Sequence, residues 1–397
     1  MPRSHTRTTS HRRIPWLRGT GDEAPATSPT RGGHTPLSGT PELEPAEHDG
    51  APPIVAVDAM GGDHGPEEAV LGAVTAAREL GLRVLLVGRR TEIASLLAEH
   101  DALREVPVVH AEDVLEMHEG ALASWRRPRS SVAVACHLIR RGIAHALVSA
   151  GSTGGIVATS TVRLRTQTGV VRPALAVPLP TGEKPTVLLD AGATADAKPE
   201  MLVQFAHLGS AYAQTAFGVH RPTVGLLTIG SEPGKGNKLA RKAGELLTSA
   251  GETGALDFHG NIEGHDLLTR TVDVVVADGH CGNIALKTVE GTAAFAMSAV
   301  REALTATPLA KAGAFFQRRS LRELRDRLDS ETYGGAALLG LNGTVVIAHG
   351  SSRAPGIAHA CRLAHDLAAG RMDEQVRRRV QHRQTNWFNR FAQHEDR

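Results

Sequence analysis

The chain reads IVAVDAMGGDHGPEEAVLGAV from residue 54 to residue 74. Its first four residues are apolar, which is typical of a strand buried on both faces. A glycine-rich turn with two aspartates and a histidine follows, and then a helical pattern with Pro66 and two glutamates in its first turn. A strand, a glycine-rich turn and a helix N-terminus together aim backbone N–H groups at an anion. The alternative is a purely structural connection, which would not need two acids and a histidine.

Strand-like and helix-like segments alternate along the rest of the chain. Further strands are predicted at 84–87, 107–110, 146–149, 186–189, 223–229, 272–277 and 344–348. Helices are predicted at 91–99, 131–140, 199–214, 238–250 and 286–304. This order predicts an α/β fold with a largely parallel sheet covered on both faces. Ligands of such sheets bind outside the carboxyl ends of the strands.

Five strand ends carry a glycine-rich turn that leads into a helix. These turns are residues 58–66, 149–155, 190–196, 230–237 and 278–283. If they share one edge of the sheet, they form a cradle for a phosphate-bearing ligand. Dinucleotide and P-loop sites are excluded by spacing, because there is no GxGxxG and Gly230 to Lys235 is one residue short of the P-loop pattern.

Composition excludes several classes of protein. Hydrophobic residues make up 41% and charged residues 22% of the 397 residues, as in ordinary globular proteins. A formal charge of +2 predicts no general affinity for nucleic acid. The three scattered cysteines predict reduced thiols in a cytoplasmic protein, and no Cys/His pair has metal-site spacing. No apolar run reaches the roughly 20 residues that span a bilayer.

The two ends of the chain differ from the middle. Residues 1–52 are rich in Arg, Pro, Ser and Thr and are predicted to be a disordered extension. This extension is either an organelle transit peptide, or a dispensable tail or over-long gene start. Residues 371–397 form a basic tail in which Val376, Val380 and three aromatic residues recur among arginines. This pattern predicts an amphipathic helix at a membrane surface. A solvated tail, or a helix packed on its own dimer, is the alternative.

Several motifs in this order resemble one family. They are DAMGGDHGP (58–66), VSAGSTGG (148–155), RPALAVPLP (172–180), LLDAGAT (188–194), VGLLTIG (224–230), FHGNIEGHD (258–266), DVVVADGHCGNIALKTVEG (273–291), YGGAALLGLNG (333–343) and HGSS (349–352). Together they resemble the bacterial phosphate acyltransferases, which are acyl-acyl-carrier-protein:phosphate transacylases. The resemblance places the catalytic domain at 53–370.

The resemblance implies a fold, a reaction and partners. The fold is a three-layer α/β/α sandwich similar to phosphotransacetylases and isocitrate dehydrogenases. The reaction moves a fatty acyl chain from acyl carrier protein to inorganic phosphate, with no cofactor or metal, and a membrane glycerol-3-phosphate acyltransferase uses the acyl phosphate in phospholipid synthesis. The implied protein is a cytoplasmic homodimer with peripheral membrane contact. In place of the family's usual residues the chain has Ser152, Thr194 and His280. A divergent acyltransferase with another thioester donor, and a non-catalytic binding protein, therefore stay open as alternatives.

Phosphate is itself the nucleophile in such a reaction, so the site needs positioning and charge stabilisation rather than an enzyme nucleophile. We expect catalytic roles for His64, Asp278, Asn283 and Lys287. We expect phosphate or substrate binding by Asp58, Gly61, Gly62, Asp63, Gly151, Ser152, Thr153, Gly154, Arg172, Lys184 and Gly282. Each cation has a surface or capping charge as its alternative.

Two further features bear on partners and mechanism. Cys281 is expected not to form an acyl-enzyme, because direct attack by phosphate suffices. Residues 311–327 carry six basic residues among apolar ones. The resemblance suggests that they form a projecting helical region that meets an acidic carrier protein or the membrane surface.

Overall fold

A computed structural model describes residues 51–115, 126–328 and 333–377. Its centre is one sheet of eleven strands in the order β3-β2-β1-β4-β11-β10-β5-β6-β9-β7-β8. The strands are β1 (Ile54–Asp58), β2 (Arg83–Gly88), β3 (Val108–His110), β4 (Ala146–Ser149), β5 (Ala174–Leu179), β6 (Thr186–Leu189), β7 (Thr223–Leu227), β8 (Asp257–Ile262), β9 (Val274–Val276), β10 (Ala336–Leu339) and β11 (Thr344–Ile347). The first and last parts of the chain meet in this sheet, because β11 lies beside β4.

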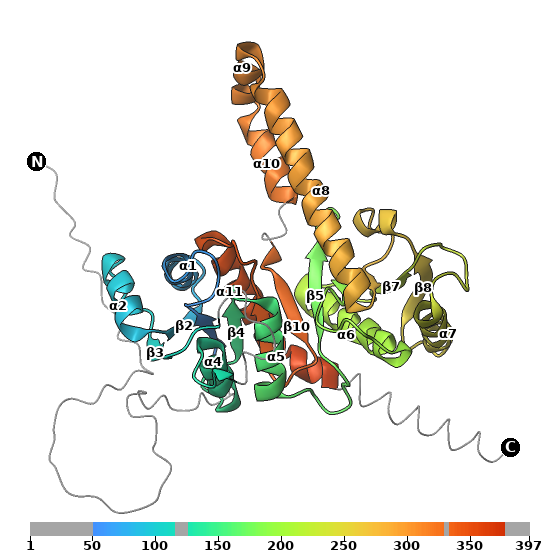
Figure 1. The fold of residues 1–397 in the computed structure, drawn as a ribbon, viewed down its shortest axis with the longest axis horizontal. Coiled ribbons are helices and arrows are strands. Elements are labelled where there is room, and N and C mark those ends of the chain that lie inside the picture. The colour runs from blue at the N-terminus through green and yellow to red at the C-terminus, as the bar shows by residue number, and fades with distance from the viewer. Residues whose placement is uncertain (1–50, 116–125, 329–332, 378–397) are drawn as a thin grey trace, which may run out of the picture.

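Helices cover both faces of the sheet (Figure 1). One face buries apolar side chains from α1 (Glu67–Arg78), α2 (Arg90–Glu99), α6 (Pro199–Phe217), α7 (Lys238–Glu252) and α11 (Ala354–Ala369). The other face packs against α4 (Ser131–Arg140), α5 (Thr153–Leu164) and the first part of α8 (Gly279–Thr305). The 3-10 helix η1 (Gly264–Leu268) follows β8. The three-layer α/β/α sandwich predicted from the sequence is therefore confirmed.

The sheet is largely parallel but reverses direction at its middle. Strand β10 is antiparallel to both β11 and β5, and β5 is antiparallel to β6. The remaining pairings among the described strands are parallel. Consequently β6, β9, β7 and β8 run opposite to β1, β2, β3, β4 and β11.

This reversal corrects one sequence prediction. The loops after β1 and β4 lie at one edge of the sheet, whereas the loops after β6, β7 and β9 lie at the opposite edge. The five glycine-rich turns therefore do not form a single cradle. The prediction was wrong because it did not include β5 and β10 as strands, and β8 was missed as well.

A helical arm projects away from the sheet (Figure 1). It consists of the second part of α8 together with α9 (Pro308–Phe316) and α10 (Arg318–Leu328). Leu309, Phe315 and Phe316 on this arm are more than half exposed. The projecting region expected around residues 311–327 is thus present. Among the described residues, no helix has the length and apolar character needed to cross a bilayer.

The chain continues to pack on the core after residue 370. Met372 and Val376 are buried, with 5% and 2% of their surface exposed. Gln167 also donates a hydrogen bond from its amide nitrogen to the Asp373 carbonyl oxygen (3.1 Å). The start of the predicted tail therefore belongs to the folded domain, and Val376 does not lie on a free amphipathic face. Residues 378–397 and 1–50 lie outside the described part of the chain.

Candidate active site

Asp58 ends β1 and holds two glycine-rich loops together. Its carboxylate accepts hydrogen bonds from the Ser149 hydroxyl (2.6 Å) and from the Met60 backbone N–H (3.0 Å). The side chain is buried, and this burial raises the pKa of the carboxyl group, while hydrogen bonds to Ser131 and Ser149 act in the opposite direction. The Asp58 side chain therefore lies buried beneath the loops and connects the ends of β1 and β4, and its role in substrate binding stays a prediction.

The loops after β1, β4 and β11 interlock at one edge of the sheet. A β-carbon on Gly61 would lie 2.7 Å from the Gly151 backbone nitrogen, so the close approach of these loops requires glycine. Gly62 has a φ of +97°, and the next residue, Asp63, donates its backbone N–H to the Gly350 carbonyl oxygen (2.8 Å). The loop 349–352 thus completes a cluster whose first two members were predicted from sequence.

A salt bridge and a helix cap fix the third loop in this cluster. Glu68 in α1 accepts one hydrogen bond from the Arg353 guanidinium (2.9 Å) and another from the Ala354 backbone N–H (2.8 Å). The second bond satisfies a free N–H at the start of α11. The loop 349–352 is therefore braced against the helix that follows the first glycine-rich turn.

The start of α8 is anchored at the opposite edge by Asp190. This carboxylate has no exposed surface and accepts backbone N–H groups from residues 175, 192, 193 and 194 at 2.7 to 3.1 Å. Gly282 packs directly against the Asp190 carbonyl oxygen. Asp278 caps α8 by accepting the Cys281 N–H (2.8 Å). These contacts show that Asp278 and Gly282 help to fix the start of α8, and their roles in catalysis and substrate binding stay predictions. The buried carboxylate of Asp190 was missed by the sequence analysis.

Helix α8 carries Lys287 from this edge toward the interlocked loops. Eight residues separate Gly279 from Lys287, which is about 12 Å of helix. The helix crosses the face of β5, where Leu286 packs in the same apolar cluster as Leu175 and Val177. Lys287 therefore lines the same pocket as Thr153, His349 and Ser352, although its own helix begins at the other edge.

A pocket of about 100 Å³ lies where α8 meets these loops. Its polar lining is Thr153, Lys287, Glu290, His349 and Ser352. The remaining lining residues are nonpolar: Leu175, Val177, Leu286, Gly335, Ala336, Ile347, Ala348 and Gly356. The pocket thus combines a cation and hydroxyl groups with an apolar floor.

Two features of this pocket suit a small anion. Thr153 is the first residue of α5, so its backbone N–H has no acceptor within the helix and lies at the positive end of the helix dipole. Lys287 forms an ion pair with Glu290, with 2.7 Å between Nζ and Oε2. Their side chains are 57% and 30% exposed, so an incoming anion can compete with Glu290 for the ammonium group. An oxyanion held here would lie beside the apolar floor.

The structure brings some predicted site residues together and separates others. Thr153 and Lys287 line the pocket, and Ser152 and Gly154 flank Thr153 at the start of α5. His64 and Asn283 are not among the residues that line it. His64 lies in the loop between β1 and α1. Asn283 lies one turn before Lys287 in α8, beside Gly192. Arg172 is exposed just before β5, at the opposite edge.

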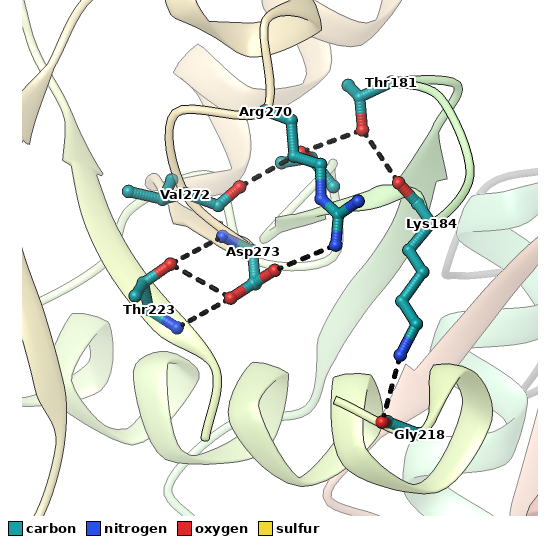
Figure 2. A network of polar contacts seen from close by, with 8 residues as sticks. Thr181, Lys184, Gly218, Thr223, Arg270, Val272 and Asp273 are labelled. Atoms are coloured by element: carbon teal, nitrogen blue, oxygen red, sulfur yellow. Dashed lines mark hydrogen bonds and ion pairs between the residues drawn. The ribbon is translucent and has the colours of Figure 1, made fainter. Parts of the chain in front are cut away.

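Lys184 was predicted to bind phosphate and lies elsewhere. Figure 2 shows its side chain extending toward Gly218, and its ammonium group donates to the Gly218 carbonyl oxygen (3.1 Å). Gly218 caps the C-terminus of α6, where a cation is favourable. Helix α6 covers the face of the sheet opposite α8. In the structure Lys184 thus takes the capping position that was given as its alternative, and phosphate binding by Lys184 stays a prediction. In the neighbouring network, the Asp273 carboxylate accepts hydrogen bonds from Thr223 and forms an ion pair with Arg270. This network joins the N-terminal ends of β7 and β9.

Cys281 lacks the properties of an activated nucleophile. Partial burial and the neighbouring Asp278 carboxylate raise the pKa of its thiol to about 11. The thiolate is the reactive form, so little of it exists near neutral pH. Within the described ranges, no group of three His, Cys, Asp or Glu side chains has an arrangement that could hold a metal ion.

Comparison with known proteins identifies the family. A family model described as "Fatty acid synthesis protein" matches residues 54–375. The chain is 66% identical over 348 residues to "Phosphate acyltransferase" of Thermobifida fusca, covering 87% of this chain and 97% of that protein. The chain belongs to the phosphate acyltransferase family. A second phosphate acyltransferase, from Cyanothece sp., is 42% identical over 330 residues and covers 82% of this chain and 94% of its own length.

Solved structures support the fold of this phosphate acyltransferase family member. "EutD phosphotransacetylase from Staphylococcus aureus" superposes with a TM-score of 0.53 at 16% identity, covering 80% of this chain and 94% of that one. A phosphotransacetylase from Streptococcus pyogenes also gives 0.53 at 17% identity, covering 80% of this chain and 94% of that one. At this identity the likeness concerns the fold alone, and it confirms the predicted similarity to phosphotransacetylases.

Three pocket residues were missed by sequence reasoning. Glu290 lies one turn beyond Lys287, and His349 and Ser352 lie in the loop after β11. The signal for the loop was available, because HGSS (349–352) follows an apolar strand and contains a glycine. It leads into a helix with Pro355 near its start, as the first glycine-rich turn does.

Proposed function

We propose that this protein transfers a fatty acyl group from acyl-acyl-carrier protein to inorganic phosphate. The observation that carries the proposal is the pocket at which Lys287, Thr153 and Ser352 adjoin the apolar floor, in a chain of the phosphate acyltransferase family. The ammonium group, the hydroxyls and the start of α5 suit phosphate oxygens. The apolar floor suits the first carbons of an acyl chain.

Different pocket residues hold the phosphate and the acyl group. Phosphate displaces the Glu290 carboxylate from Lys287, and the Lys287 ammonium group then holds a phosphate oxygen. The backbone N–H and hydroxyl of Thr153 donate to the same anion or to the oxyanion that forms at the thioester carbonyl. Leu175, Val177 and Leu286 exclude water from the acyl group. Phosphate attacks the thioester directly, without a covalent acyl-enzyme intermediate. The main catalytic contribution is therefore to hold the two reactants close together in the correct orientation.

The arm provides a surface for the proposed partners. Exposed apolar residues Leu309, Phe315 and Phe316 lie among basic residues of α9 and α10, and the Arg318 guanidinium lies 5.1 Å from the centre of the Phe315 ring. We propose that this surface meets an acidic carrier protein or an anionic membrane in the cytoplasm. Membrane contact would bring the acyl phosphate near a membrane glycerol-3-phosphate acyltransferase. A homodimer is proposed as well, and its mass in solution tests that part separately.

A donor panel tests the function. Purified protein is mixed with radioactive phosphate and acyl-acyl-carrier proteins of several chain lengths, with the matching coenzyme A thioesters in parallel. Acyl phosphate is separated without hydroxylamine and is measured by its radioactive phosphate group. We expect phosphate-dependent product with the carrier-protein thioesters. Product with other thioesters alone would favour the divergent acyltransferase, and no product from any donor would favour a binding protein.

A further inference from the structure

Glu290 lies at the centre of the helix face that lines the pocket. Three residues of α8 line this pocket, namely Leu286, Lys287 and Glu290. Successive residues of an α-helix are about 100° apart, so Glu290 lies about 40° from Leu286 and about 60° from Lys287, between the two. Helical side chains tilt toward the N-terminus of the helix, and the Glu290 carboxylate accordingly lies beside the Lys287 ammonium group, with 2.7 Å between Oε2 and Nζ. These positions place the carboxylate on the pocket side of α8.

Comparison with a second ion pair shows that Glu290 is more enclosed than a surface carboxylate. Lys242 and Glu245 in α7 form the same kind of pair, three residues apart and at 2.8 Å. The side chains of Lys287 and Lys242 are 57% and 59% exposed, but Glu290 is 30% exposed and Glu245 is 65% exposed. Since the spacing and the distance match, the difference comes from the surroundings of Glu290, which are the walls of the pocket.

A carboxylate beside an anion site needs a proton between the two negative charges. Lys287, Thr153 and the start of α5 offer hydrogen-bond donors to an anion. An ionised carboxylate, in contrast, only accepts hydrogen bonds. Inorganic phosphate near neutral pH keeps an O–H group that can donate to it, whereas sulfate has none. A carboxylate at this place therefore attracts monohydrogen phosphate and repels sulfate, although the two dianions have similar size.

We propose that Glu290 determines the specificity of this pocket for monohydrogen phosphate by accepting a hydrogen bond from the O–H group of the anion. The proposal rests on the proposed function and gives a role to the residue that phosphate displaces from Lys287. After this displacement the carboxylate remains on the same face of α8, one turn from the ammonium group, and so lies beside the bound anion. Among the described residues that line the pocket, Glu290 is the one that carries a carboxylate.

Competition between phosphate and sulfate tests the proposal. The ratio of the two affinities is measured by equilibrium dialysis with radioactive phosphate in the absence of an acyl donor, and also as inhibition of acyl phosphate formation by sulfate. Sodium chloride keeps the ionic strength constant, because salt screens all charge interactions. A hydrogen bond to a charged group contributes a factor of roughly 10 to 100, so wild type should prefer phosphate by about that factor. Glu290→Gln should bring the ratio close to one, since an amide can donate to sulfate as well as accept from phosphate.

A second probe needs no variant. Monofluorophosphate has the shape and charge of monohydrogen phosphate, but fluorine replaces the O–H group. It should bind wild type as weakly as sulfate does. Binding of monofluorophosphate as tight as that of phosphate would overturn the proposal, because recognition would then not depend on the proton.

Controls separate the possible failures. The affinity ratio cancels any effect of Glu290→Gln that is common to both anions, such as the release of Lys287 from its ion pair. Glu245→Gln breaks the matched pair in α7 and should keep the wild-type ratio. Equal affinity of wild type for the two anions, or an unchanged ratio in Glu290→Gln with wild-type circular dichroism, would overturn the role of Glu290 and leave the proposed function standing. Selective phosphate binding without acyl phosphate from any donor would overturn the proposed function instead.

Discussion

Replacing Lys287 with alanine should weaken the use of phosphate with little effect on the fold. A hydrogen bond from a charged group contributes about 1.5–3 kcal/mol. Lys287 is 57% exposed, so we take the lower part of this range. Phosphate must also displace Glu290, and an exposed ion pair offsets about 0.2–1 kcal/mol. The net loss is about 0.5–1.8 kcal/mol, which is about 2- to 20-fold in kcat/KM for phosphate.

The chain offers a matched control for this substitution. Lys242 in α7 forms the same kind of pair with Glu245, at 2.8 Å and with 59% of its side chain exposed. Lys242→Ala removes an equivalent surface pair far from the pocket, so its phosphate kinetics should equal those of wild type. Phosphate would be varied at saturating acyl donor while thiol release is followed. Equal phosphate kinetics for the two variants would refute the placement of Lys287, and a lower melting temperature in Lys287→Ala alone would indicate a structural cause.

Four further results are expected. Gly61→Ala should lower the free energy of unfolding by about 1–3 kcal/mol, because its β-carbon would lie 2.7 Å from two atoms. As a control, Gly291→Ala places a β-carbon in open space on α8 and should not destabilise the protein. Urea titration measures the unfolding free energy of both variants. Asp58→Asn should destabilise most near pH 4. Burial raises the pKa of Asp58 in the folded protein, so the wild type loses stability as pH rises from the pKa of the unfolded chain toward the pKa of the folded protein. The Asn variant lacks this dependence. The difference in unfolding free energy between wild type and variant should therefore narrow as pH rises and then become constant. Cys281→Ser should keep its activity, and mass-spectrometric detection of an acylated Cys281 in the absence of phosphate would contradict direct attack. Met372→Ala should cost about 2–5 kcal/mol, since the side chain is buried; an unchanged urea midpoint would show that the segment after residue 370 is dispensable for stability.

The sequence was sufficient for the fold class and for the most local parts of the site. The apolar run 54–57, the glycine-rich turn and the helix after it are local patterns, and each appears in the structure as β1, a loop and α1. Lys287 and Thr153 were also found from local context, as residues near helix starts that follow glycine-rich turns. Such patterns depend on the conformational preferences and hydrophobic spacing of a few neighbouring residues, so they can be recognised in the sequence alone.

The tertiary structure alone decided which of these parts meet. The apolar pattern of a strand does not contain its direction, so the reversed pairing of β5 and β10 divided the five predicted loops between two edges. It was the path of α8 across the sheet that brought Lys287 to the loops after β4 and β11, beside His349. The position of Lys184 also depends on tertiary structure, because its hydrogen-bond partner Gly218 is 34 residues away in the chain. Contacts between distant segments depend on packing of the whole sheet, and no local stretch of sequence records them.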